Sequence, residues 1–111
     1  MTKRAYLGDL EEIVLLAVAR CEPDAYGMRI RQEIEGQTER HVAIGAVYAA
    51  LERLEEKGYL KPASAPGNGG SDPRARRFFT VTAAGARAAT ETAALRDRLW
   101  QGLRLRREGR S

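Results

Sequence analysis

Residues 43–60 read AIGAVYAALERLEEKGYL, and this stretch decides the fold. Apolar side chains recur in it every three or four residues, which places them on one face of a helix: Val47, Ala50, Leu51 and Leu54. Gly58 stands where the C-terminal cap of such a helix is expected, and the Tyr and Leu that follow favour extended chain. The stretch predicts a helix over 43–57 that turns sharply into a β-strand.

Two amphipathic segments precede this helix. Residues 9–20 carry apolar side chains at helical spacing, with three acidic residues in the first turn, where the helix dipole favours negative charge. Pro23 and Asp24 break the pattern, and residues 25–37 (AYGMRIRQEIEGQ) then form a second helical pattern. We expect Gly36 to end this second helix.

A hairpin and a long helix are expected after the third helix. Residues 59–63 (YLKPA) and 76–82 (RRFFTVT) favour strands, and the intervening APGNGGSDPR at 65–74 is rich in residues that break regular structure. Residues 82–105 contain no proline, and at 1.5 Å per residue their helix would extend roughly 36 Å. Because it outruns the small domain before it, we expect its stripe to meet a second chain, with interface residues Leu95, Leu99, Trp100 and Leu103.

Composition narrows the function. The 111 residues fit one domain. Residues 1–58 carry 8 basic and 11 acidic side chains, 59–81 carry 4 and 1, and 82–111 carry 7 and 3, which suggests an anionic partner at the middle and end of the chain. One cysteine, one histidine and no phosphate-binding loop argue against a disulfide framework, a multi-cysteine metal site, a cofactor or an enzyme. No long apolar run directs the chain to a membrane, so we expect a cytoplasmic protein.

The predicted order is mainly α with a small β-hairpin, the order of a winged helix-turn-helix, in which the third helix enters a DNA major groove. Four sequence segments, in their order and spacing, resemble the PadR family of bacterial transcription regulators: LGDLEEIVLLAVAR (7–20), AYGMRIRQEIE (25–35), IGAVYAALERLEEKGYL (44–60) and RARRFFTVTAAG (74–85). The single C-terminal helix is similar to the compact subgroup of that family. The resemblance implies a DNA-binding domain at 1–81, a dimerisation helix at 82–105 and a polar tail at 106–111.

The resemblance also implies a homodimer that binds a palindromic operator as a repressor and is released by a small molecule. The first half of the third helix is nearly bare of charge, so we expect it to enter the groove with Tyr48 as the leading contact, while hairpin cations grip phosphates. The expected DNA-binding residues are Ala46, Tyr48, Ala49, Arg53, Lys61, Arg74, Arg76 and Arg77. We expect the effector to be hydrophobic or aromatic and to lie near Arg96 and Trp100, on the dimerisation helix.

Other interpretations stay open. Tyr48 is either a DNA contact or a cover for the core, and Arg76 and Arg77 either grip DNA or line a solvated strand edge. Trp100 either binds a ligand or anchors the dimer. The acidic second half of the third helix also fits a winged-helix module that docks a protein, and an accessory protein that binds DNA weakly without sequence preference is a third possibility. Cys21 is expected to be a small buried filler.

Overall fold

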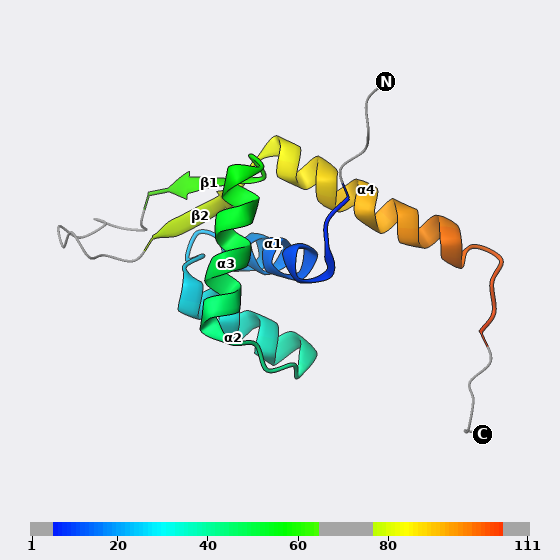
Figure 1. Cartoon of the computed structure of the whole chain (residues 1–111), viewed down its shortest axis with the longest axis horizontal. Coiled ribbons are helices and arrows are strands. Elements are labelled where there is room, and N and C mark those ends of the chain that lie inside the picture. Colours follow the sequence, from blue (N-terminus) through cyan, green and yellow to red (C-terminus); the bar gives the residue numbers. More distant parts are fainter. Residues whose placement is uncertain (1–5, 65–76, 106–111) are drawn as a thin grey trace.

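Three helices enclose one apolar core, and a two-stranded hairpin and a fourth helix are attached to it (Figure 1). The structure, a computed structural model, describes residues 6–64 and 77–105. Its elements are α1 (Asp9–Cys21), α2 (Gly27–Thr38), α3 (Ile44–Glu56), β1 (Leu60–Ala63), β2 (Phe78–Val81) and α4 (Ala83–Trp100). This is the mainly helical winged-helix order that the sequence predicts.

The core forms where the apolar stripes of the first three helices meet. Val14 and Val18 of α1 face Ile30 of α2 and the stripe of α3, and all of these side chains are buried. The hairpin closes the core with Leu60 and Phe79, which are also buried. All four residues predicted as the apolar face of α3 are buried, so the spacing argument for that helix is confirmed.

The segment between α1 and α2 does more than interrupt two helices. Strand β2 pairs with β1 in antiparallel register, with Leu60 opposite Val81. On its other side, the Phe79 amide donates to the carbonyl oxygen of Ala25 at 3.0 Å, and the Val81 amide donates to the Glu22 carboxylate at 3.0 Å. The linker thereby covers the second edge of the hairpin, which would otherwise expose unpaired backbone groups.

Hydrogen bonds join the end of α3 to the start of α4. Gly58 has φ +81, the left-handed conformation expected of a helix-ending glycine. The Thr82 hydroxyl donates to the Gly58 carbonyl at 2.7 Å and accepts from the Gly85 amide at 3.0 Å, while the Thr82 amide donates to the Tyr59 carbonyl at 3.0 Å. We call residues 58, 59, 82 and 85 the α3–α4 clasp.

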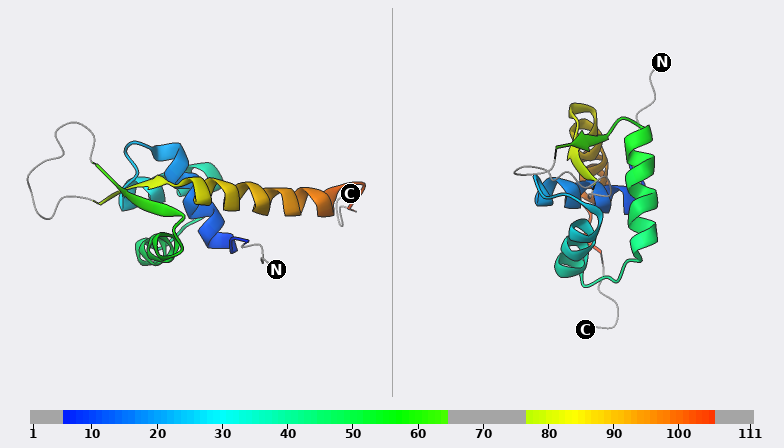
Figure 2. Two further views of the ribbon diagram at one scale, coloured as in Figure 1. Left: turned by 90° about the horizontal axis from the view of Figure 1, so that it is seen from above. Right: turned by 90° about the vertical axis from the view of Figure 1, so that its left-hand side faces the viewer.

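Helix α4 starts against the core and then leaves it (Figure 2). Gly85, Ala88 and Thr92 are buried, and the Thr92 hydroxyl accepts from the amide of Leu7 at 3.0 Å. The last turns extend past the three-helix body, and Leu99 is 70% exposed there. The second half of α4 therefore forms an arm, residues 93–100.

Two helix ends differ from the prediction. Gly36 does not end α2, which continues to Thr38 and stops where Glu39 adopts φ 58. Gly36 is exposed with open space around it, so its weak helix propensity is overridden by the turns on either side. Helix α4 ends at Trp100 rather than at residue 105, because Gly102 turns the chain at φ +73. Its length is about 27 Å at 1.5 Å per residue, and Leu103 lies beyond it. The predicted tail at 106–111 lies outside the described residues.

The clasp predicts that Gly85 tolerates no side chain. A β-carbon at Gly85 would overlap the Tyr59 carbonyl oxygen and lie 3.0 Å from its carbonyl carbon. Because both obstacles are backbone atoms, Gly85→Ala should lower the free energy of unfolding by about 1–3 kcal/mol. The matched control is Gly36→Ala, which meets no atom in a helix interior and should raise it by about 0.5–1 kcal/mol. Urea denaturation at fixed protein concentration measures both, and equal shifts of the same sign would contradict the clasp.

Candidate nucleic-acid interface

Tyr48 joins α3 to the first turn of α2. Its side chain is 52% exposed, and its ring lies against Gly27, where an added β-carbon would overlap the ring and lie 2.7 Å from the hydroxyl oxygen. One side of the ring therefore covers the start of α2, and the other side is exposed to solvent. The hydroxyl lies at the N-terminal end of α2, where a helix has amides without partners inside the helix and a positive dipole end.

The remainder of the early α3 surface is small. Gly45 and Ala49 are exposed, and Ala46 is half-buried against the core. Small side chains let a helix approach a base pair closely, and alanine can contact a thymine methyl group. The first half of α3 is thus free of charge and free of bulk apart from Tyr48.

The hairpin cations differ in what they contact. Lys61 is exposed on β1 and forms no ion pair within the described part of the chain. Arg77, next to β2, donates to both oxygens of Glu55 on α3, at 3.1 and 3.2 Å, and lies over the Phe79 ring. Arg74 and Arg76 lie outside the described residues.

Arg53 contacts α1. Its guanidinium donates to Glu11 at 3.2 Å, and Lys57 donates to both oxygens of the same carboxylate at 3.1 and 3.0 Å. Glu11 is buried, and its burial raises its pKa, but the bonds from Lys57, the Gly8 amide and Arg53 outweigh burial and hold the pKa below its usual value. Arg53 therefore joins α3 to α1. Its partner Glu11 lies 42 positions earlier in the sequence, a separation that no sequence spacing indicates.

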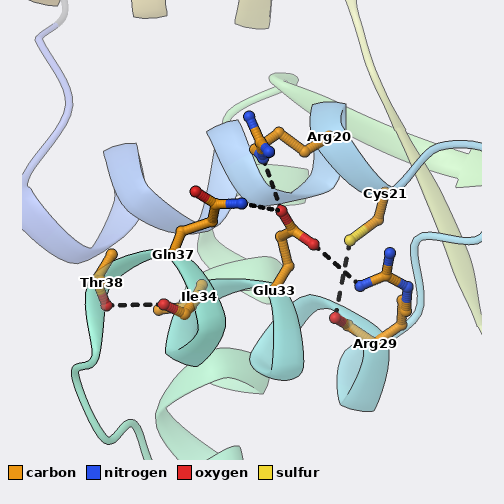
Figure 3. Close-up of polar contacts among 7 residues, drawn as sticks. All are labelled: Arg20, Cys21, Arg29, Glu33, Ile34, Gln37 and Thr38. Carbon is orange, nitrogen blue, oxygen red and sulfur yellow. Dashed lines mark hydrogen bonds and ion pairs between the residues drawn. The ribbon is translucent and has the colours of Figure 1, made fainter.

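A second network joins α1 to α2 (Figure 3). Glu33 accepts from Arg20 at 2.7 Å, from Arg29 at 3.1 Å and from Gln37 at 3.2 Å, and the bonds from Arg20 and Arg29 lower its pKa. The Cys21 thiol is buried beside it and donates to the Arg29 carbonyl at 3.7 Å, and burial raises the pKa of this thiol. A protonated, enclosed thiol is the buried filler that the sequence predicts.

The predicted interface and effector residues lie on or beside the arm. Leu95 is half-buried, Leu99 and Trp100 are 70% and 56% exposed, and Leu103 is exposed beyond the helix end. Arg96 donates to Glu12 of α1 at 2.9 Å, so it joins the arm to the body.

An apolar pocket of about 190 Å³ lies between α1 and α2, lined in part by Ile13, Leu16 and Ile34.

The described residues contain no group of three or more His, Cys, Asp or Glu side chains able to hold a metal ion. None of the helices described has an apolar stretch that could cross a lipid bilayer.

Known proteins share this sequence pattern and fold. Residues 15–91 match the model of the transcriptional regulator PadR-like family. The structure is similar to a PadR-like transcription factor from Bacteroides fragilis, with a TM-score of 0.66, 23% identity and coverage of 83% of this chain and 84% of that one. A PadR-like regulator from Bacillus cereus is similar with a TM-score of 0.60 and 18% identity, over 85% of this chain and 93% of that one. MarR from E. coli, in its apo form, is similar with a TM-score of 0.60 and 19% identity, over 88% of this chain and 67% of that one. At these identities the structures show a shared fold. No curated protein matches the sequence.

The Glu11 network makes stability depend on pH. Because Glu11 binds its proton less tightly when folded, its contribution is complete above its ordinary pKa of 4.5 and is lost as the pH falls through the lower folded value. Glu11→Gln should therefore lower the free energy of unfolding near neutral pH by about 1.5–3 kcal/mol. Urea denaturation should show that the difference in unfolding free energy between the native chain and this variant closes below the ordinary pKa of Glu11. Glu52→Gln, at an exposed carboxylate of α3, is the control and should change little. A gap that stays constant into acid would contradict the assignment.

Proposed function

Because the chain belongs to the PadR-like transcriptional regulator family, whose winged-helix fold is that of a DNA-binding regulator, we propose that it is a cytoplasmic repressor. In this proposal a homodimer binds a palindromic operator, and a small hydrophobic or aromatic molecule releases it. The observation that carries the proposal is the first half of α3, where small residues surround the half-exposed Tyr48, whose ring lies against the first residue of α2.

Tyr48 would contribute to DNA binding with its hydroxyl. The hydroxyl lies at the N-terminal end of α2, and the dipole and unpaired amides of a helix N-terminus favour an anion such as a phosphate. With the phosphate held there, Ala46 and Ala49 would face the bases, and Lys61 would reach the flanking backbone from β1. Arg74 and Arg76 would add charge from outside the described residues.

The proposed DNA contacts of Tyr48 and Lys61 differ in how they depend on salt concentration. A neutral hydroxyl releases no counterion, whereas each lysine that neutralises a phosphate adds about one to the slope of log Kd against log salt concentration. Tyr48→Phe should therefore weaken binding about tenfold, roughly 1.4 kcal/mol, with the slope unchanged. Lys61→Ala should lower the slope by about one.

The experiment starts by selecting bound fragments from random duplex DNA, since a palindrome among them reveals a two-fold symmetric complex. Titrations at several salt concentrations then compare the native chain with both variants. Arg98→Ala, at an exposed cation of the arm, is the control and should keep the native slope. Failure to enrich any duplex, with a flat salt response, would favour a winged-helix module that docks a protein.

The arm would form the dimer. The buried positions Ala88 and Thr92 continue, at helical spacing, into Leu95 and Leu99, and the chain's own body leaves the last turn uncovered. Exposed apolar side chains gathered on a projecting helix are typical of a protein interface. We propose that Leu95, Leu99, Trp100 and Leu103 pack against a second copy.

Charge on the arm should separate the subunits. Leu95→Asp with Leu99→Asp would bury two carboxylates in the proposed seam, so sedimentation should show a monomer where the native chain is a dimer. Thr90→Asp, about half a turn away from this stripe on the same helix, should remain dimeric. A double variant that sediments as a dimer would remove α4 from the interface.

The effector would release DNA by acting on the same helix, α4. Trp100 offers an aromatic face within the proposed seam, and Arg96 offers a cation one turn earlier, already bound to Glu12. A hydrophobic or aromatic effector between the subunits would change the angle between the two arms. Because the clasp joins the start of each α4 helix to its own α3, the separation of the two α3 helices would change with that angle.

A further inference from the structure

Glu55 and Arg77 form the one ion pair, among the described residues, that joins α3 to the hairpin. The Nη2 group of Arg77 donates to both carboxylate oxygens of Glu55, at 3.1 and 3.2 Å. On its other side the guanidinium lies over the Phe79 ring, 5.1 Å from the ring centre. The side chain is thus folded back onto the protein between a carboxylate and an aromatic face.

The position of Glu55 on α3 gives this pair its importance. Tyr48, Glu52 and Glu55 are spaced by four and three residues, so they share one face of the helix. The face that presents the proposed tyrosine contact therefore also carries two carboxylates. A phosphate that approaches this face meets repulsion, and Arg77 cancels the charge of one of the two.

This pair differs from the other ion pairs of α3. Arg53 and Lys57 bind Glu11, whose side chain is only 10% exposed, so those bonds are part of the packed structure. The side chains of Arg77 and Glu55 are 64% and 28% exposed. An ion pair at such a surface contributes little to stability, and an arginine bonds as readily to a phosphate as to a carboxylate.

We propose that Glu55 is an affinity-setting residue that withholds Arg77 from DNA. In the native chain Glu55 holds the guanidinium on the protein surface, and without the carboxylate charge the guanidinium would transfer to a backbone phosphate of the flanking DNA. The inference rests on the proposed function, since it describes how strongly the same interface attracts phosphates. Its consequence is lower affinity for every duplex, which limits binding to DNA outside the operator.

The opposite role for Glu55 is that it aims Arg77 at a phosphate. The neutral variant Glu55→Gln separates the two, because it keeps the size of the side chain and removes the charge. If Glu55 withholds Arg77, E55Q should bind both operator and an unrelated duplex of equal length about three- to tenfold more tightly at low salt. The slope of log Kd against log salt concentration should steepen by about one, the value for one added phosphate contact. If Glu55 aims Arg77, E55Q should bind more weakly.

Two further variants complete the experiment. Glu56→Gln removes an exposed carboxylate from the same helix end, outside the Arg77 pair, and should leave the slope unchanged. In an Arg77→Ala background, E55Q should no longer steepen the slope, because no guanidinium is left to transfer. Thermal unfolding of each variant confirms that the fold is intact.

The outcomes distinguish the two levels of the proposal. A native chain that binds no duplex overturns the proposed function itself. A native chain that binds DNA, with an E55Q variant that binds equally or more weakly, or that keeps the native slope, overturns the role of Glu55 alone.

Discussion

The α3–α4 clasp is the constraint on which the rest of the structure depends. It consists of backbone and hydroxyl hydrogen bonds across a contact so close that position 85 has no room for a β-carbon. Few side-chain motions can loosen such a contact, because the atoms that meet belong to the main chain. The direction in which α4 leaves the body is therefore set by the end of α3, together with the bonds from Leu7 to Thr92 and from Arg96 to Glu12. In a dimer built on the arms, the same bonds would set how far apart the two α3 helices lie.

The described charges explain why a chain with net charge +4 has a small cationic surface at the candidate interface. Arg20 and Arg29 bind Glu33, Arg53 and Lys57 bind Glu11, and Arg96 binds Glu12. Arg29 bonds within α2, the other four cations join two helices, and none of the five is available to a phosphate without loss of a native contact. What remains on the described hairpin is Lys61 and the exposed Arg77 pair. Affinity for DNA would thus depend on a few side chains whose partners can change.

Sequence periodicity predicts the elements well where packing and local preference agree. The apolar face of α3, the turn at Gly58 and the hairpin follow from spacing and turn chemistry. Gly36 shows the limit, because a weak helix former continues a helix when its neighbours are held by other bonds. Gly102 carried a signal that could have been used, since a glycine after the last apolar turn marks a helix end.

The site could be predicted only in part, because its contacts join residues far apart in the chain. The sequence shows Tyr48 as the one large exposed side chain expected near the start of the third helix. Its contact with Gly27, 21 positions earlier, joins two helices and has no local sequence signal. The partners of Arg53 and Arg77 lie 42 and 22 residues away, and no local pattern points to them.

The contact of Tyr48 with Gly27 also gives a physical reason for two of the sequence segments that mark the family. The glycine after Tyr26 leaves space at the start of α2, and the tyrosine of the third helix fills it. A side chain at position 27 would displace the ring. Since the ring is held against α2, its hydroxyl has a fixed place beside small residues, which would read bases only by close contact. Selectivity in the proposed interface would then come mostly from the spacing of the two α3 helices, which the clasp and the arm would set in the proposed dimer.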